Sequence, residues 1–376
     1  MLASVADEVD AQQSRMKIVH VETGRHFYGG AQQVVWLVRG LVDRGVDSLL
    51  VCTPGSAIDK VARDAGLQVA NVACAGEHDL RFAWRLHSLL RKEKPDILHC
   101  HSRRGADFPG GWAAVSSRTP AIVSRRVDSP ESPTAAAIRY APFKKIVAIS
   151  EHIAAVLGKS RIRGKRLSVI RSAVDADAVK SNVDRAILHT QFGISVHGYA
   201  IAVVAQLIKR KGHRFLLDVL PGLLAEHPGI KVVFFGSGNA ESQIRALTAK
   251  LGLSGAVHFA GFRDDVDDYL GAFDLLVHPA EKEGLGVAML KAAAAGLPVV
   301  AFDTAGSAEA VIHGRTGILV PPGDLAALQR AIGVLVTERD IGPELGAAGR
   351  RWMKDEFSVA AMVDSYIELY EEMLNE

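Results

Sequence analysis

Two successive series of short apolar strands, each alternating with amphipathic helices, constrain this sequence more than any other feature. Strands are predicted first at 17–22, 48–52, 96–100, 121–124, 146–149 and 167–170, and then at 200–205, 231–235, 256–259, 274–277 and 298–302. Strands separated by helices pair in parallel, because each crossover returns the chain to the same edge of the sheet. A chain of 376 residues is also long enough for two cores. We therefore predict an α/β protein with two doubly wound, parallel-sheet domains.

The expected domain boundaries follow from where the strand pattern starts, lapses and resumes. They are a disordered N-terminal tail at 1–15, an N-terminal domain at 16–178, a linker at 179–198, a C-terminal domain at 199–356, and a terminal amphipathic helix at 357–376 that packs back on the N-terminal domain. Ligands of open parallel sheets bind outside the carboxyl ends of the strands. If two such edges face each other, we expect a ligand-binding cleft between the domains.

Composition places the chain among globular proteins rather than membrane-spanning ones. It is 48% hydrophobic and 23% charged, and no stretch approaches the ~20 apolar residues of a membrane span. The first fifteen residues lack the basic start and apolar run of a signal peptide. Cys52, Cys74 and Cys100 show no metal-ligand spacing, which indicates reduced core residues. We expect a cytoplasmic protein, either free or peripheral on the inner face of the plasma membrane.

The net charge of +2 conceals a strongly basic segment in the N-terminal half. Fourteen lysines and arginines but only four acids lie between Arg103 and Arg171. A solvated basic face is one interpretation, and an anionic partner, such as an acidic lipid or a phosphorylated acceptor, is the other. The residues predicted to form this surface are Arg103, Arg104, Arg125, Arg126, Lys144 and Lys145. Nucleic acid is disfavoured, because no recognition motif or aromatic platform accompanies the charge.

Three of the predicted strand-to-helix loops have features of anion-binding loops. Gly29-Gly30 precedes a helix, where backbone N–H groups can approach an anion, although a tight turn has the same pattern. The cations Lys209-Arg210-Lys211 follow a strand and suit a diphosphate, with a solvated charge run as the alternative. Gly236-Ser237-Gly238 follows the next strand but lacks the third glycine of a dinucleotide fingerprint.

The loop Glu283-Gly284-Leu285-Gly286 carries the most specific signal. A carboxylate beside two glycines at a helix start can accept hydrogen bonds from sugar hydroxyls while backbone N–H groups hold a phosphate. The small residues at 292–296 would let the following helix pack closely on the sheet. This loop therefore predicts a site for a nucleotide sugar.

Together, these motifs resemble family 4 of the retaining glycosyltransferases, of the bacterial cell-envelope or lipopolysaccharide type. That family has the GT-B fold, in which two Rossmann-like domains enclose a cleft. The resemblance runs from Met16 to the terminal helix and rests on Gly29-Gly30-Ala31, Pro95-Asp96-Ile97-Leu98-His99-Cys100-His101, Lys211-Gly212, Gly236-Ser237-Gly238, Gly261-Phe262-Arg263, Glu283-Gly284-Leu285-Gly286 and Gly296-Leu297-Pro298-Val299-Val300.

The resemblance also implies residue roles. Lys211 would stabilise the leaving phosphate, Glu283 would bond hydroxyls of the transferred sugar, and His101 would lie near the transferred sugar and the acceptor, unless it is a core histidine. The implied donor-binding residues are Gly29, Gly30, Gln206, Gly236, Gly238, Phe262, Arg263, Gly284, Leu285, Gly286, Val287 and Lys291.

Two positions depart from the family pattern at the donor site. The family usually has an arginine where this chain has Gln206, and a second glutamate where it has Lys291. Losing an arginine–phosphate contact worth ~1.5–3 kcal/mol would weaken donor binding by roughly one to two powers of ten. One hypothesis is that Lys291 relocates the missing positive charge. The other is a degenerate transferase that acts as a non-catalytic binding partner.

The expected function is sugar transfer, with retention, from a nucleotide sugar to a saccharide or lipid-linked acceptor of the cell envelope, such as lipopolysaccharide core. No cofactor or metal is expected, because the loops carry no DxD-type carboxylate cluster. A nucleotide-sugar epimerase is an alternative, which would convert the donor without an acceptor. A dinucleotide oxidoreductase is disfavoured by the incomplete glycine fingerprint.

Overall fold

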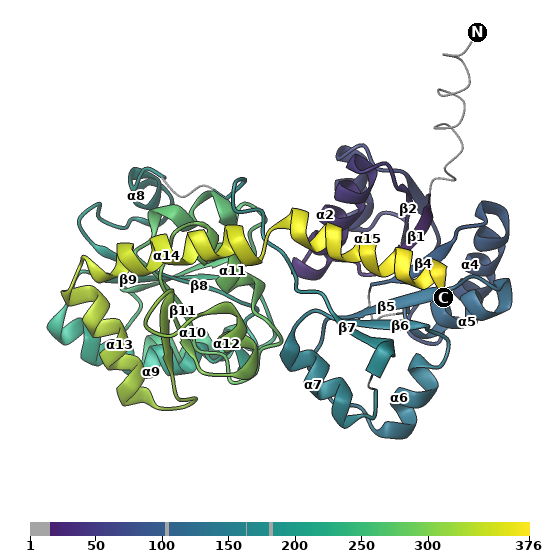
Figure 1. Cartoon of the computed structure of the whole chain (residues 1–376). Coiled ribbons are helices and arrows are strands. Elements are labelled where there is room, and N and C mark those ends of the chain that lie inside the picture. The colour runs from purple at the N-terminus through teal and green to yellow at the C-terminus, as the bar shows by residue number, and fades with distance from the viewer. Residues whose placement is uncertain (1–15, 102–104, 163, 180–182) are drawn as a thin grey trace, which may run out of the picture. The chain divides into compact units, whose positions relative to one another are not determined.

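The computed structural model describes residues 16–101, 105–162, 164–179 and 183–376. The chain divides into two compact units, which we call unit 1 and unit 2. Unit 1 comprises the described residues up to Ile170 together with Met362–Glu376, and unit 2 comprises Arg171–Ala361. Each unit is an α/β domain with one parallel sheet, so the predicted fold class is confirmed (Figure 1).

The sheet of unit 1 has seven strands in the order β3-β2-β1-β4-β5-β6-β7. Their bounds are β1 Lys17–Glu22, β2 Asp47–Cys52, β3 Val69–Asn71, β4 Ile97–Cys100, β5 Ala121–Arg125, β6 Lys145–Ala148 and β7 Leu167–Val169. The order reverses between β1 and β4, which pair directly with His20 opposite His99. The edge strand β3 was not predicted, because three residues are too short to show a strand pattern.

Helices cover both faces of this sheet (Figure 1). They are α2 Gly29–Asp43, α3 Ala57–Asp64, α4 Leu80–Glu93, α5 Phe108–Ser117, α6 Pro133–Tyr140, α7 Glu151–Lys159 and most of α15 Val359–Asn375. Successive strand residues face opposite sides, so Val19 and Val21 join the core under α4 to α7. His20, which lies between them, points to the face that α2 and α15 cover.

The sheet of unit 2 has six strands in the order β10-β9-β8-β11-β12-β13. Their bounds are β8 Tyr199–Val204, β9 Ile230–Phe235, β10 Val257–Gly261, β11 Leu275–His278, β12 Val299–Phe302 and β13 Gly317–Val320. Here the order reverses between β8 and β11, so the loops after these strands lie side by side. The edge strand β13 was missed by the sequence pattern.

Two buried clusters fill the faces of this second sheet. The helices are α8 Ala186–Phe192, α9 His213–Glu226, α10 Glu241–Lys250, α11 Val287–Ala294, α12 Ala305–Ala310, α13 Leu325–Thr337 and α14 Ile341–Glu356, with short 3-10 turns η3 Lys209–Lys211, η4 Val266–Asp268 and η5 Leu270–Ala272. One cluster packs α8, α11 and α14 on the sheet, and the other packs α9, α10 and α13. The apolar strands are thus buried on both faces, as a parallel sheet requires.

The expected linker at 179–198 differs from the structure. This stretch carries α8, and Val179, Leu188 and Ile194 are buried in a core cluster of unit 2 together with Val174. The stretch is polar in sequence because α8 buries only one side, and that pattern hid its packing. Residues Met362–Glu376 of the terminal helix belong to unit 1. The tail at 1–15 lies outside the described residues.

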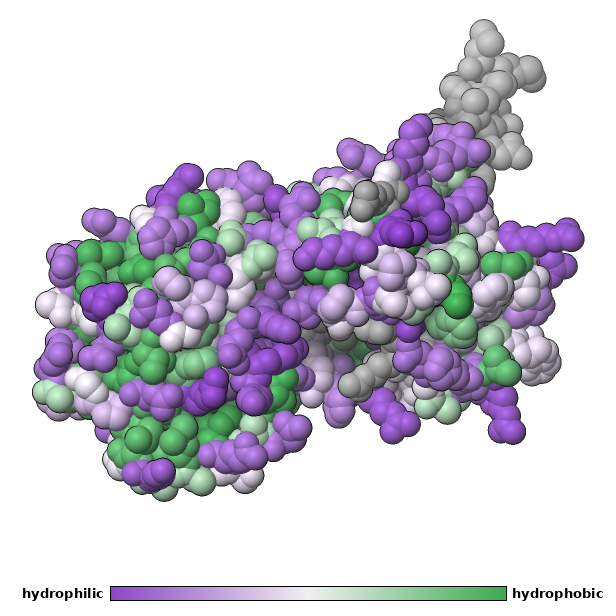
Figure 2. Space-filling model, turned by 90° about the horizontal axis from the view of Figure 1, so that it is seen from below, coloured by the Kyte–Doolittle hydropathy of each residue, from purple (hydrophilic) through white to green (hydrophobic). Residues whose placement is uncertain are grey.

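No helix in the described part of the chain is long and apolar enough to cross a membrane. Figure 2 shows one face of the molecule, on which hydrophilic residues interrupt the hydrophobic ones.

Candidate active site

The loop after β8 is held against the loop after β11 by a glycine. Gly212 has φ of +72° and directly precedes α9 as its N-cap, and a Cβ atom there would overlap the carbonyl oxygen of Pro279. Only glycine fits this close approach. The contact fixes the η3 turn, and with it Lys211, beside the residues that follow β11.

Lys211, His278 and Glu283 form a buried polar cluster at this point. The Lys211 ammonium makes an ion pair with Glu283 Oε2, and His278 Nε2 lies 2.7 Å from the same oxygen. The second carboxylate oxygen, Oε1, accepts the backbone N–H of Gly284 at 3.1 Å. The side chains of Lys211 and Glu283 are only 12% and 11% exposed, so these interactions are poorly screened by water.

The cluster keeps Glu283 ionised. Burial alone would raise the pKa of this carboxyl, but the hydrogen bond from His278 and the charge of Lys211 hold the pKa well below its usual value. His213, at the start of α9, is buried next to them, and burial first, then the neighbouring His278 and Lys211, lowers its pKa to about 4. Both His213 ring nitrogens lack a hydrogen-bond partner among the described residues. A carboxylate with a depressed pKa is a poor proton acceptor but a good hydrogen-bond acceptor.

The loop between β11 and α11 brings backbone groups to this edge in addition to the side chain of Glu283. Gly286 has φ of +78° and precedes Val287, the first residue of α11. Leu285, predicted to line the donor pocket, is 2% exposed and lies in the core. The Leu285 side chain is therefore not available to a ligand, and this residue can contribute only its backbone.

The predicted glycine pair after β9 has a packing role. A Cβ at Gly236 would overlap the carbonyl oxygen of Ala205, and one at Gly238 would overlap that of Leu207. The two loops are also joined by a hydrogen bond from the Leu207 N–H to the Ser237 oxygen at 3.0 Å. Gln206 is exposed on the same loop.

Two other predicted donor-site cations are already paired. Lys291, on α11, bonds Asp267 at 2.7 Å, so its charge is balanced locally rather than left for a phosphate. Arg263 donates to both oxygens of Asp265, at 2.7 and 2.6 Å, and to the hydroxyl of Tyr269. Phe262 is 54% exposed beside it.

In unit 1, the predicted glycine loop ends where α2 starts. Gly29 is the first residue of α2, and Tyr28 caps the helix without a side-chain hydrogen bond. The Cδ of Arg126 would lie 3.5 Å from a Cβ at Gly30. Arg126 is partly buried, and its Nε has no partner among the described residues.

Three buried histidines lie under the same face of unit 1. His20 Nδ1 is 3.0 Å from His101 Nε2, and the rings of His99 and His101 are 3.7 Å apart between centroids. His99 is fully engaged: its Nδ1 lies 2.6 Å from the Tyr370 hydroxyl and its Nε2 lies 2.8 Å from Ser124 Oγ. Alternation along β4 puts His99 and His101 on one side of the sheet.

Burial keeps these rings neutral. It lowers the pKa of His20 to about 3, and it holds the pKa values of His99 and His101 well below the ordinary value. The ligand atoms of the three rings lie within 4.8 Å of one another, the one such group among the described residues. A metal ion would compete with the hydrogen bonds that His99 makes to Tyr370 and Ser124.

Comparisons with known proteins agree with this architecture. The model described as glycosyl transferases group 1 matches residues 184–352, and the model described as glycosyltransferase family 4 matches residues 28–178. The chain belongs to glycosyltransferase family 4. The oxidoreductase and epimerase alternatives are therefore set aside, and the glycosyltransferase is an enzyme of the GT-B type.

Similar proteins span the full length of the glycosyltransferase. It is 27% identical to the lipopolysaccharide core biosynthesis glycosyltransferase LpsE of Rhizobium meliloti, over 94% of this chain and 98% of the relative. It is 28% identical to the 2-deoxystreptamine glucosyltransferase of Streptomyces kanamyceticus, over 91% and 98%. The solved structure of Anabaena Alr3699/HepE with UDP and glucose is 20% identical with a TM-score of 0.85, covering 95% of this chain and all of the other.

The basic surface predicted for the glycosyltransferase requires a correction. Arg125 is 4% exposed and bonds the carbonyl oxygens of Val127 and Ser129, while Lys145 is 2% exposed and bonds Glu372 and Glu376 of α15. Neither is a surface cation, because each occupies a strand position that the sheet buries. Lys144 is exposed. Arg103 and Arg104 lie outside the described residues.

Sequence analysis missed several residues of the glycosyltransferase that lie within these clusters. The predicted strand at 274–277 stops one residue before His278, which was not assigned to the site, and His20 was only part of the predicted strand at 17–22. The available signal was topological: His278 ends β11, which adjoins β8 where the strand order reverses, and His20 of β1 pairs with His99 of β4.

Proposed function

We propose that this enzyme transfers a sugar, with retention of configuration, from a nucleotide sugar held by unit 2 to an acceptor held by unit 1. The observation that carries the donor assignment is the cluster of Lys211, His278 and Glu283 at the reversal point of the second sheet. It offers a cation for phosphate and an ionised carboxylate for sugar hydroxyls within one buried site.

The proposed chemistry breaks the bond between the anomeric carbon and the diphosphate oxygen, and the electron pair leaves with the diphosphate. Lys211 and the backbone N–H groups near Gly286 stabilise the developing negative charge. The acceptor hydroxyl forms the new bond to the anomeric carbon, and its proton passes to the departing phosphate. No metal ion is needed in this scheme.

Glu283 is proposed to bind rather than to attack or deprotonate. Its depressed pKa makes it a weak base, and its two oxygens already accept hydrogen bonds from His278 and the Gly284 N–H. A carboxylate in this state holds sugar hydroxyls in position. His101, buried and neutral, lies too deep in the fold to reach a ligand unless the surface above it rearranges.

We propose a saccharide or lipid-linked saccharide of the cell envelope as the acceptor, with lipopolysaccharide core as the leading candidate. The support is the similarity to two Rhizobium meliloti glycosyltransferases of lipopolysaccharide core biosynthesis, LpsE and LpsD, along 94% and 95% of this chain. A nucleoside diphosphate sugar as donor is supported by the structures of Alr3699/HepE with UDP and with UDP-glucose. The three cysteines, all described, form no disulfide, which favours a reducing compartment such as the cytoplasm.

The decisive experiment is a calorimetric titration of the full chain with UDP-, GDP-, ADP- and CMP-sugars. One donor should bind saturably, and Lys211→Ala should weaken it about 10- to 100-fold, the effect of one charge-assisted hydrogen bond. Lys250→Ala, which removes an exposed lysine from α10 in the same unit, is the matched control and should stay within about twofold. If no donor binds, or if both variants bind like the native chain, the proposed donor site is wrong.

A further inference from the structure

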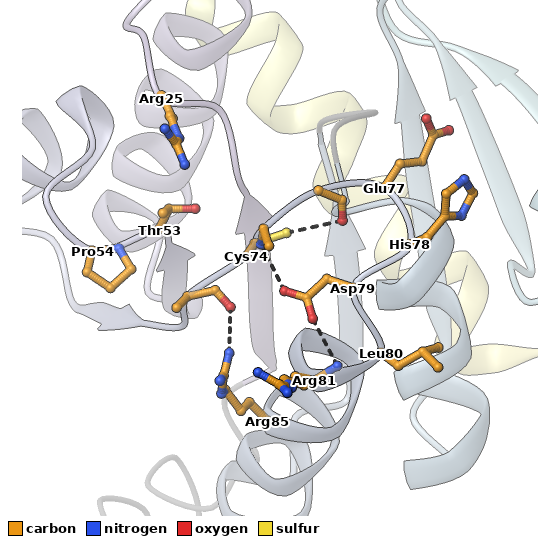
Figure 3. A pocket seen from close by; sticks show the side chains of 13 residues that line it. Arg25, Thr53, Pro54, Cys74, Glu77, His78, Asp79, Leu80, Arg81 and Arg85 are labelled. Carbon is orange, nitrogen blue, oxygen red and sulfur yellow. Dashed lines mark hydrogen bonds between the residues drawn. The ribbon is translucent and has the colours of Figure 1, made fainter.

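Unit 1 contains an open pocket that none of the predicted site residues lines. Its volume is about 940 Å³, and it lies at the carboxyl-end loops of β1, β2 and β3. Arg25 comes from the first loop, Thr53 and Pro54 from the second, and residues 73–81 with Arg85 from the third and the start of α4. In Figure 3, Arg25 stands on one side of the pocket and Arg81 and Arg85 lie on the other, with Cys74 and Asp79 between them.

The two acids of this pocket are engaged by the protein itself. Asp79 caps α4: its oxygens accept the backbone N–H groups of Ala75, Arg81 and Phe82 at 2.8, 2.9 and 3.0 Å. These hydrogen bonds, that of Ala75 first, lower the pKa of the Asp79 carboxyl. Glu77 forms an ion pair with Arg139, which lies outside the pocket lining. Both carboxylates are therefore held by hydrogen bonds or an ion pair within unit 1, and Asp79 also lies close enough to Arg85 to interact with its charge.

The arginines, by contrast, keep most of their donors for a ligand. Arg25 and Arg81 are exposed, and no described residue bonds their guanidinium groups. Arg85 donates one N–H to the carbonyl oxygen of Ala73, at 3.1 Å. Three guanidinium groups, one from a loop and two from α4, surround this pocket and form a site for an oxyanion, because their planar forks match phosphate oxygens.

We propose that this pocket binds the phosphate group of a phosphorylated saccharide, and that this saccharide is the acceptor. The inference rests on the proposed function and deepens it, because it names a charge that the acceptor must carry. The pocket volume exceeds what a phosphate alone requires and accommodates a sugar ring beside it. The same phosphate chemistry could be offered by a free phosphorylated saccharide or by one linked to a lipid.

The neighbouring surface of α4 lets an experiment separate these two sources. Leu80 lines the pocket and is 80% exposed, and Trp84, one helical turn further on, is 70% exposed. Apolar side chains beside exposed arginines are typical of helices that contact a membrane interface. They are dispensable for a small soluble ligand.

The first test is calorimetric titration of the full chain with glucose 6-phosphate, glucose and inorganic phosphate. Glucose 6-phosphate should bind more tightly than either other probe, and Arg81→Ala should weaken it at least about 10-fold. Arg91→Ala, which removes an exposed arginine of α4 that does not line the pocket, is the matched control and should change the affinity less than about twofold. Equal weakening by both variants, or equal binding of phosphate and glucose 6-phosphate, overturns the proposal.

A second readout covers the case in which an arginine variant folds poorly. Cys74 lines the pocket, whereas Cys52 and Cys100 are fully buried. Iodoacetamide should therefore label Cys74 of the native chain, and glucose 6-phosphate should slow that labelling at least about threefold. Labelling that is unaffected at a saturating concentration of glucose 6-phosphate contradicts binding in this pocket.

Vesicles containing lipid A, a phosphorylated glycolipid, test the lipid-linked source. If the native chain binds them and the Leu80→Ser/Trp84→Ser double variant does not, while glucose 6-phosphate binds both equally, the lipid-linked form is supported. If vesicles do not bind but glucose 6-phosphate does, the free form is supported. Vesicle binding that persists in Arg81→Ala overturns the phosphate site.

The pocket and the proposed function can fail separately. The nucleotide-sugar titration is repeated on Arg81→Ala, and donor affinity should be unchanged, because Arg81 belongs to unit 1. If the native chain binds glucose 6-phosphate but no nucleotide sugar, the proposed function is wrong and the phosphate site in the pocket is supported. If it binds a nucleotide sugar but not glucose 6-phosphate, only the phosphate site is wrong.

Discussion

The two units differ in whether the lysines and arginines near the carboxyl ends of their strands are paired with carboxylates. In unit 2, three cations near these strand ends face carboxylates, in the pairs Lys211–Glu283, Arg263–Asp265 and Lys291–Asp267. In unit 1, the pocket residues Arg25 and Arg81 have no side-chain partner within the described chain. A ligand of unit 2 must therefore displace a carboxylate, whereas a ligand of unit 1 meets cations that only water covers. Paired cations, as in unit 2, favour selectivity between ligands. Unpaired cations, as in unit 1, favour electrostatic attraction of anions, which salt weakens.

The largest expected effect comes from replacing the carboxylate of the buried pair. Glu283→Gln keeps the size of the side chain but removes the charge that holds Lys211. We expect the sugar-transfer rate to fall about 10²- to 10³-fold, the usual effect of losing one preorganised polar contact. The affinity for the nucleoside diphosphate alone should rise, about 3- to 10-fold, because Lys211 no longer has to leave a carboxylate. Steady-state kinetics and calorimetry measure the two effects.

Glu281→Gln is the control for these opposite effects on the transfer rate and on nucleoside diphosphate affinity. Glu281 is 39% exposed and lies 3.7 Å from Arg214, so its loss should change neither quantity more than about twofold. If Glu283→Gln weakens nucleoside diphosphate binding instead, Glu283 does not compete for Lys211, and the contrast between paired and unpaired cations fails at this site.

A smaller effect is expected from the glycine that positions Lys211. Gly212 and Gly252 have nearly the same backbone conformation, with φ of +72° and +71°, but only Gly212 lies against another backbone segment. Gly252→Ala should cost about 1 kcal/mol of unfolding free energy, the strain of a left-handed alanine. Gly212→Ala should cost at least about 2 kcal/mol more, because its Cβ would overlap the Pro279 carbonyl oxygen.

Urea unfolding and donor titration of the two variants test this difference. Gly212→Ala should also weaken donor binding, because relieving the overlap moves the η3 turn that carries Lys211. Equal stabilities for the two variants would mean that the loop shifts freely, and the close approach would then not be what holds Lys211 to Glu283.

The sequence predicted what local pattern controls and missed what topology brings together. The apolar strand runs and the glycines before helices identified both sheets and the Glu283 loop, because period and backbone freedom are local properties. The pairing of Lys291 with Asp267 and of Lys145 with Glu372 joins residues 24 and 227 positions apart. Such pairs depend on which strands and helices become neighbours. Counting charges along the chain therefore overestimated the basic surface at Lys145.

The buried histidines should also make the stabilities of the two units depend differently on pH. Burial lowers the pKa of His20 to about 3 from 6.5, and the pKa values of His99 and His101 are also well below 6.5. Below pH 6.5 these histidines are protonated in the unfolded chain but stay neutral in the folded one. The unfolding free energy of unit 1 therefore falls as the pH falls. Each such ring lowers the unfolding free energy by about 1 kcal/mol between pH 6.5 and 5.5, and by up to about 1.4 kcal/mol per pH unit at lower pH, where the unfolded ring is fully protonated. In unit 2, burial lowers the pKa of His213 to about 4 and also lowers the pKa of the exposed His258.

Hydrogen exchange at pH 6.5 and 5.5 can compare the two units within one molecule. Amides of β1 and β4 in unit 1 should lose more protection than those of β8 and β11 in unit 2, because burial lowers the pKa values of three histidines in unit 1 but of two, His213 and His258, in unit 2. His20→Leu should reduce the loss in unit 1 by the share of one ring, about 1 kcal/mol over that unit of pH, whereas His258→Gln should leave unit 1 unchanged. An equal or steeper loss in unit 2 would show that the buried histidines of unit 1 accept protons without unfolding. The cluster of His20, His99 and His101 would then become positively charged in acid, and the attraction of unit 1 for anions would grow as the pH falls.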